Sequence, residues 1–121
     1  MPFPIIWGIP KNTPQEKLVE LRKRIVKTLV DAMDVSAYWV RPLFPIDMLS
    51  EPKEECEGCN TIYGSLDTGM FFGKKDVDNL AKTVTAALAQ IIWDEFGGRY
   101  EVEVFITNLD PHWSTLLLSK G

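Results

Sequence analysis

The proline at position 2 has the most distinctive chemical potential of any residue in the chain. Methionine aminopeptidase removes an initiator methionine when the next side chain is as small as proline, so Pro2 would then carry a secondary amine. At the start of the apolar run 2–8, that amine would lose hydration, which disfavours its charged form. A neutral amine near pH 7 is a general base, so the sequence predicts that Pro2 moves protons.

Cationic and aromatic side chains elsewhere in the chain could complete a proton-transfer site. A keto–enol tautomerisation moves a proton from carbon and needs a positive or donor group where negative charge builds on oxygen. Arg41 would anchor a substrate carboxylate and lower the pKa of a nearby amine by like-charge proximity. Either Lys11 or Lys74 could assist. The candidates for an apolar wall that excludes water are Trp113, Phe3 and Phe105.

Each of these residues also has an ordinary structural role open to it. Arg41 would serve equally in a surface or interface ion pair, and Lys11 and Lys74 could be solvated turn residues. Trp113 could anchor the C-terminal tail on the sheet or on a neighbouring subunit. The single histidine, His112, is expected to be an exposed tail residue and not an acid catalyst.

The composition excludes several classes of protein. The chain has 121 residues, and 45% of them are hydrophobic, which suits one ordinary domain with a real core. A net charge of −4 argues against binding to nucleic acid, which requires a concentrated basic surface. No apolar run is long enough to span a membrane, and no secretory signal precedes the first strand. A cytoplasmic location is therefore expected.

Two cysteines, Cys56 and Cys59, form a CxxC motif with acidic neighbours. Structural zinc requires four ligands, and this pair with one histidine cannot supply them. A redox role would need surroundings that favour the thiolate, whereas acidic neighbours disfavour it. The motif is therefore expected to be incidental to a loop, with redox and metal roles as alternatives.

Two amphipathic helices stand out between the segments that could position these residues. The first is predicted to begin with Thr13 as N-cap, Pro14 at the first helical position and Glu16 closing a capping box, and to end near Met33. Its apolar stripe consists of Leu18, Leu21, Ile25, Leu29 and Ala32. The second helix is expected to begin after Asp76 and to stop near residues 96–98, with Gly97 as its left-handed cap.

Four strands are expected around these helices. Their ranges are Pro2–Gly8, Tyr38–Ile46, Thr61–Phe72 and Glu101–Thr107, with a loop over Asp47–Asn60. The order predicts an α+β fold of two β-α-β units, with halves of about 1–59 and 60–121 within a single domain. Right-handed parallel crossovers would give a four-stranded mixed sheet with both helices on one face. The other face would be bare and apolar, so other copies of the chain should cover it in a homo-oligomer.

Three stretches of the chain resemble the tautomerase superfamily, which includes 4-oxalocrotonate tautomerase, macrophage migration inhibitory factor and malonate semialdehyde decarboxylase. Pro2 opens an apolar strand, Val40-Arg41 lies at a similar spacing from it, and residues 108–114 read Asn-Leu-Asp-Pro-His-Trp-Ser. The segment 71–74, Phe-Phe-Gly-Lys, is similar to an uncharacterised bacterial branch. The resemblance implies that Pro2 is catalytic, that Arg41 binds a carboxylate, that Asn108 joins the substrate-binding residues, and that the assembly is a trimer.

The sequence also departs from the family pattern. The decarboxylases carry an aspartate near the start of the second strand, where this chain reads Val-Ser-Ala-Tyr over 35–38. Paired arginines after the third strand are missing as well, and the nearest cations there are Lys74 and Lys75. Lys11 lies one residue out of step with the family's early arginine, and lysine lacks arginine's bidentate fork. These differences disfavour decarboxylase and hydrolytic dehalogenase chemistry.

Three hypotheses follow from the sequence. The first is a tautomerase-like enzyme that needs no cofactor or metal and acts on a small 2-oxo or 2-hydroxy-enoate acid with Pro2 as base. The second is a non-catalytic oligomeric binding protein that keeps the fold, and retention of Met1 would favour it because the amine would be blocked. The third is an unrelated ferredoxin-like domain with a ligand cleft.

Overall fold

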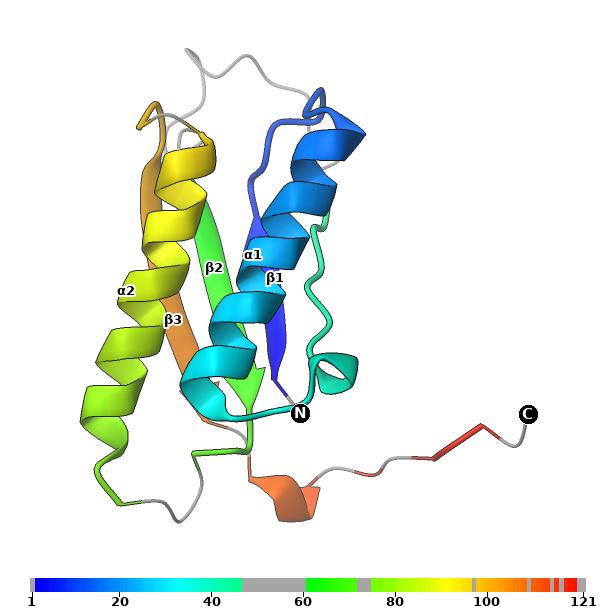
Figure 1. The fold of residues 1–121 in the computed structure, drawn as a ribbon, viewed down its shortest axis with the longest axis vertical. Coiled ribbons are helices and arrows are strands. Elements are labelled where there is room, and N and C mark those ends of the chain that lie inside the picture. The colour runs from blue at the N-terminus through cyan, green and yellow to red at the C-terminus, as the bar shows by residue number, and fades with distance from the viewer. Residues whose placement is uncertain are drawn as a thin grey trace.

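The computed structural model is an α+β fold in which two helices pack on one face of a three-stranded mixed sheet (Figure 1). It describes residues 2–46, 61–71, 75–96, 98–108, 110–113, 115 and 117–119. The elements are β1 (Phe3–Trp7), α1 (Gln15–Met33), the 3₁₀ turn η1 (Ala37–Trp39), β2 (Thr61–Thr68), α2 (Val77–Glu95), β3 (Glu101–Asn108) and the 3₁₀ turn η3 (Pro111–Trp113).

The sheet has the order β1-β2-β3, with β2 in the centre. Strand β1 runs antiparallel to β2, and β3 runs parallel to β2. The helix α2 therefore makes the parallel crossover that was expected in the second half of the chain. The register pairs Phe3 with Asp67, and it pairs Thr68 with Asn108.

The prediction of a strand over Tyr38–Ile46 was wrong, and the sheet has three strands, not four. Residues 37–39 form η1 instead, and only Leu43 makes a parallel bridge, to Ile5. The Leu43 N–H donates to the Pro4 carbonyl at 2.9 Å, and the Ile6 N–H donates to the Leu43 carbonyl at 2.9 Å. The predicted strand is thus reduced to one bridge along the outer edge of β1.

Prolines on both chains explain why this ladder stops after one bridge. In a parallel ladder the next bonds would lie two residues on in each direction. One of them requires a donor on Pro4 for the Arg41 carbonyl, and the other requires a donor on Pro45 for the Ile6 carbonyl. Proline has no N–H, so neither bond can form.

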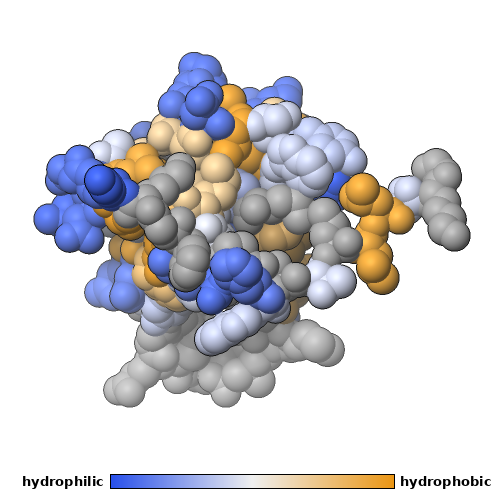
Figure 2. Space-filling model, turned by 90° about the horizontal axis from the view of Figure 1, so that it is seen from below, coloured by the Kyte–Doolittle hydropathy of each residue, from blue (hydrophilic) through white to orange (hydrophobic). Residues whose placement is uncertain are grey.

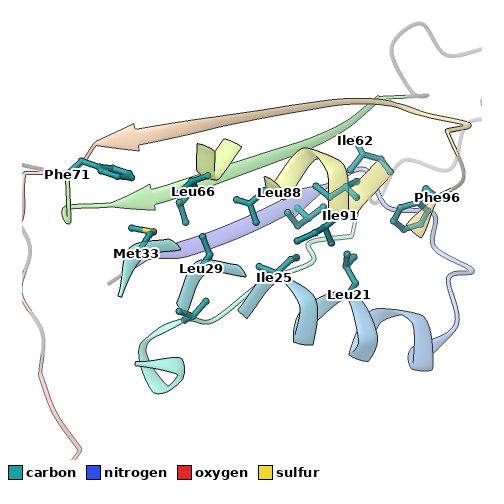
Figure 3. Packing of buried hydrophobic residues seen from close by; sticks show 14 residues of the cluster. Leu21, Ile25, Leu29, Met33, Ile62, Leu66, Phe71, Leu88, Ile91 and Phe96 are labelled. Atoms are coloured by element: carbon teal, nitrogen blue, oxygen red, sulfur yellow. The ribbon is translucent and has the colours of Figure 1, made fainter. Parts of the chain in front are cut away.

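The two helices bury their apolar stripes between each other and the sheet. Figure 3 shows Leu21, Ile25 and Leu29 of α1 pointing toward the sheet, with Phe71 and Phe96 at opposite ends of the core. The cluster of buried hydrophobic residues is Ile6, Leu21, Ile25, Leu29, Met33, Val40, Ile62, Leu66, Phe71, Val84, Leu88, Ile91, Ile92 and Phe96. Burial of this apolar surface is the main force that holds the helices on the sheet.

The first helix begins one residue later than the capping box predicts. Pro14 is the N-cap, and no side chain caps the helix. The Thr13 hydroxyl instead donates to the Pro10 carbonyl at 2.6 Å, which fixes the preceding turn. The end at Met33 was predicted correctly, and Asp34 follows it in the left-handed conformation.

The second helix has Asp76 at its N-cap, as predicted, and runs to Glu95. The predicted cap Gly97 lies outside the described residues. An ion pair joins the two helices, because Arg24 of α1 donates to Glu95 at 2.9 Å and lies 3.4 Å from Asp94. The hydrogen bond to Glu95 raises the pKa of Arg24 above its ordinary value.

The face of the sheet away from the helices, here called the open face, carries large exposed side chains. Trp7, Tyr63 and Phe105 are 47%, 40% and 45% exposed and come from the three strands. This apolar, uncovered face agrees with the expectation from the sequence. Within the described part of the chain, neither helix could cross a membrane.

Candidate functional site

Several elements meet at the end of the molecule that holds the N-terminus. Figure 1 shows that β2 and β3 end there, that η1 lies beside the start of β1, and that η3 follows β3 at the same end. Figure 2 looks onto this end, where hydrophobic and hydrophilic surfaces alternate and the C-terminal segment stands away from the body. This is the end at which Pro2 lies.

Pro2 occupies the first position of the sheet row at this end. Continuing the register by one residue places Pro2 level with Thr68, which in turn pairs with Asn108. Pro2 is less than 2% exposed in the single chain, and Thr68 is fully buried. The Thr68 hydroxyl accepts a hydrogen bond from the Met70 N–H at 3.1 Å. Pro2 therefore begins the sheet in a buried position, as the sequence predicts.

The direction of the Pro2 nitrogen follows from the bridge to Leu43. Along a strand, backbone groups of alternate residues point to opposite edges. The Pro4 carbonyl and the Ile6 N–H both point to the edge that Leu43 occupies. Pro2 has the same parity, so its nitrogen points to this edge and away from β2. The segment between η1 and Leu43 is therefore the part of the chain that faces the nitrogen.

Arg41 lies on this segment. The parallel register places it level with Phe3, on the open-face side like Leu43 and Ile5. Its guanidinium carbon lies 5.5 Å from the centre of the Tyr38 ring. Among the described residues, no carboxylate forms an ion pair with Arg41. The structure thus brings an unneutralised cation to the edge that the Pro2 nitrogen faces.

Other predicted residues lie farther from Pro2 within one chain. Phe3 is next to it and half-buried on the open face. Phe105 shares that face but belongs to β3, two strand spacings or about 10 Å from β1. Asn108 ends β3, and Trp113, which is 88% exposed, follows in η3.

The two predicted lysines are not near Pro2 in the described structure. Lys11 follows β1 at the opposite end of the molecule, just before α1 (Figure 1). It could reach a Pro2 site only from another copy of the chain. Lys74 lies outside the described residues, as do Cys56 and Cys59.

Sequence reasoning missed two groups of residues at this end. Tyr38 and Trp39 form an exposed aromatic pair in η1, and they went unnoticed because their segment was expected to be a strand. Ser36, a typical cap residue just before them, was the available signal for a turn. Asp67 is the second group, a half-buried carboxylate beside Phe3 on the open face.

A Tail histidine pairs with a neighbouring carboxylate, since His112 Nδ1 lies 2.9 Å from Asp110 Oδ1. The His112 N–H donates to the same oxygen. Within the part of the chain that the structure describes, no three His, Cys, Asp or Glu side chains are grouped as metal ligands would be. The arrangement at this end offers an amine, a cation and aromatic surface.

A separate cleft of about 540 Å³ lies at the other end of the molecule, between the start of α1 and the end of α2. Lys17 and Arg99 line it together with Asp94 and Glu95, so its charges largely balance. The Lys17 ammonium lies 4.9 Å from the centre of the Phe96 ring. This cleft does not include Pro2 or Arg41.

Solved structures resemble the whole of this chain. A macrophage migration inhibitory factor-like protein from Entamoeba histolytica matches with a TM-score of 0.70 at 8% identity, covering 98% of this chain and 96% of its own. Native fused 4-OT matches with a TM-score of 0.64 at 15% identity, covering 88% and 86%. The protein Pt0534, solved after inactivation by 2-oxo-3-pentynoate, matches with a TM-score of 0.61 at 14% identity, covering 89% and 84%.

The chain has the tautomerase superfamily fold. Searches with protein-family models and against curated sequences found no match. The likeness therefore lies in the arrangement of the backbone, and the identities are too low to carry over an activity. Within the tautomerase fold, the local geometry around Pro2 and Arg41 is what bears on function.

Proposed function

We propose that the protein is a tautomerase-like enzyme in which the Pro2 amine is the general base. One observation carries the proposal: in a tautomerase fold, the Pro2 nitrogen points to the edge of β1 at which the unneutralised Arg41 lies. Proximity to this cation disfavours protonation of the amine, and burial acts in the same direction. Both effects favour the neutral amine that proton abstraction requires.

The reaction would convert a small 2-oxo acid into its 2-hydroxy-enoate form, or the reverse. The Arg41 guanidinium binds the substrate carboxylate through charge-assisted hydrogen bonds. The Pro2 nitrogen accepts a proton from the carbon next to the keto group, and negative charge moves to the keto oxygen. The proton returns to that oxygen, so the amine ends the cycle neutral and no cofactor is consumed.

The same proposal includes a homotrimer that covers the open face. Trp7, Tyr63 and Phe105 expose apolar surface there that a partner would bury. In such an assembly Lys11 or Lys74 of one copy could approach Pro2 of another. Phe105, Asn108 and Trp113 would then join the apolar and polar walls of a shared pocket. The cytoplasmic location expected from the sequence belongs to this proposal as well.

The test compares enolisation by wild type and Pro2→Ala on a panel of small 2-oxo acids, including an aryl pyruvate. General base catalysis contributes roughly 10²–10⁴-fold, so kcat/KM should fall by at least about 10² in the variant. The intact mass of untagged protein must first show that Met1 is absent. Inactivity of a preparation that begins with Pro2 would exclude the enzymatic role.

A specific observation keeps the non-catalytic binding protein as the second candidate. Pro2 is less than 2% exposed in the single chain, so a substrate cannot reach its nitrogen without a change at the N-terminus. Removal of Met1 is the change that the first proposal requires. Retention of Met1 in purified protein, together with a stable oligomer, would favour the binding role.

A further inference from the structure

The turn that precedes Arg41 is tightly hydrogen-bonded although it lies at an exposed end of the molecule. The Ser36 hydroxyl accepts from the Tyr38 N–H at 3.3 Å. The Trp39 N–H donates to the Ser36 carbonyl at 3.0 Å, and the Val40 N–H donates to the Ala37 carbonyl at 3.2 Å. Val40, which is buried in the core, fixes the end of this turn. The backbone that carries Tyr38 is therefore held in place.

The Tyr38 side chain is exposed but not without contacts. Its ring is 67% exposed, so burial in the core does not account for its position. The ring meets Trp39 edge to face, with 5.0 Å between centroids and 84° between planes. Arg41 places its guanidinium carbon 5.5 Å from the centre of the same ring. An aromatic ring thus lies between a rigid turn and the cation of the proposed site.

We propose that Tyr38 is a positioning residue that holds the Arg41 guanidinium ready for a substrate carboxylate. The inference rests on the proposed role of Arg41 in carboxylate binding. A long arginine side chain loses much rotamer freedom when it binds, and a side chain already held over a ring loses less. An aromatic ring also leaves the positive charge in place, whereas a carboxylate partner would neutralise it.

The edge contact with Trp39 supports this role of Tyr38. Edge-to-face aromatic pairs have a preferred geometry, so Trp39 limits the orientations of the Tyr38 ring. The ring face is what a cation requires, and the phenol hydroxyl has no part in the contact. The proposal therefore depends on the ring and not on the hydroxyl, which makes phenylalanine the matched control.

The experiment compares wild type, Tyr38→Phe and Tyr38→Leu in steady-state enolisation of a 2-oxo acid. A cation–π contact at an exposed site corresponds to a change of roughly two- to fivefold. Tyr38→Leu should raise KM by that factor with kcat unchanged, and Tyr38→Phe should match wild type. In an Arg41→Ala background, Tyr38→Leu should have no further effect on KM. Because Tyr38 is exposed, circular dichroism should show all variants folded.

A binding measurement separates this inference from the proposed function. Quenching of tryptophan fluorescence on titration with a saturated analogue of the 2-oxo acid reports carboxylate binding without turnover. If wild type lacks turnover but Tyr38→Leu still weakens binding two- to fivefold, the enzymatic proposal fails and the positioning role stands. Equal binding by wild type and Tyr38→Leu, an effect shared by Tyr38→Phe, or an effect that persists without Arg41 would each overturn it.

Discussion

Replacement of Gly8 by alanine should weaken the fold more than the same change at Gly98. Both glycines have positive φ, +87° for Gly8 and +70° for Gly98. A Cβ on Gly8 would lie 2.7 Å from the backbone oxygen of Thr61, which the sheet holds in place. A Cβ on Gly98 would lie 3.0 Å from the ring of Trp93, a half-exposed side chain that can move. The pair therefore separates a rigid clash from backbone strain.

The expected magnitudes follow from these contacts. Left-handed backbone costs an alanine about 1–2 kcal/mol, and overpacking against a fixed group costs about 1–3 kcal/mol. Loss of glycine's freedom in the unfolded chain offsets about 0.4–1 kcal/mol. Gly8→Ala should thus lower the free energy of unfolding by about 3 kcal/mol, and Gly98→Ala by about 1 kcal/mol. At this chain length, these losses correspond to falls in Tm of roughly 10 °C and 4 °C.

Urea unfolding followed by circular dichroism measures both variants, at one protein concentration because association would shift the transition. The order of the two losses is the decisive result. If Gly98→Ala is as damaging as Gly8→Ala, then contact with the Thr61 carbonyl adds nothing to backbone strain. The position at which β1 leaves the sheet would then be misassigned, and with it the register that places Pro2.

Two further predictions concern the Pro2 end. Thr68→Val removes the acceptor of the buried Met70 N–H and should lower the free energy of unfolding by about 1–3 kcal/mol. Thr68→Ser keeps the hydroxyl and should cost clearly less in the same urea titration; equal losses would refute a role for this hydrogen bond. Leu43→Pro removes the donor to the Pro4 carbonyl, costs about 1 kcal/mol and, by loosening the Arg41 segment, should raise KM for a 2-oxo acid. Leu43→Ala keeps that N–H, so an equal rise in KM would contradict the argument.

The sequence predicted the elements whose signal is local. The apolar period of the first helix ends at Met33, where α1 ends, and Asp76 precedes α2 as expected. Thr13 was a reasonable cap by its type, but its hydroxyl is taken by the Pro10 carbonyl. A competing turn of this kind is difficult to foresee because it requires the backbone geometry before the helix.

The missing strand had a cause outside its own segment. Pro42 and Pro45 were visible in the predicted range and were compatible with an edge strand. The ladder also fails because Pro4, on the partner strand, has no donor for the Arg41 carbonyl. That conflict depends on the pairing register, which a single sequence does not contain.

The candidate site was predictable in part for the same reason. A parallel segment after the first helix must return to the start of β1, so the approach of Arg41 to Pro2 follows from the order of elements. Lys11 lies at the opposite end because β1 carries the chain away from Pro2 before α1 begins. The aromatic pair of η1 required knowledge that residues 37–39 form a turn.

The most direct test of a basic Pro2 amine is the mass of the N-terminal peptide after incubation with 2-oxo-3-pentynoate. A neutral secondary amine adds to the electrophilic alkyne of this 2-oxo acid, so the whole reagent is retained and nothing leaves. The account predicts that the peptide begins with Pro2, gains the mass of one reagent molecule, and does so in step with the loss of activity. A peptide that begins with Met1, or an adduct confined to lysine or cysteine, would contradict it.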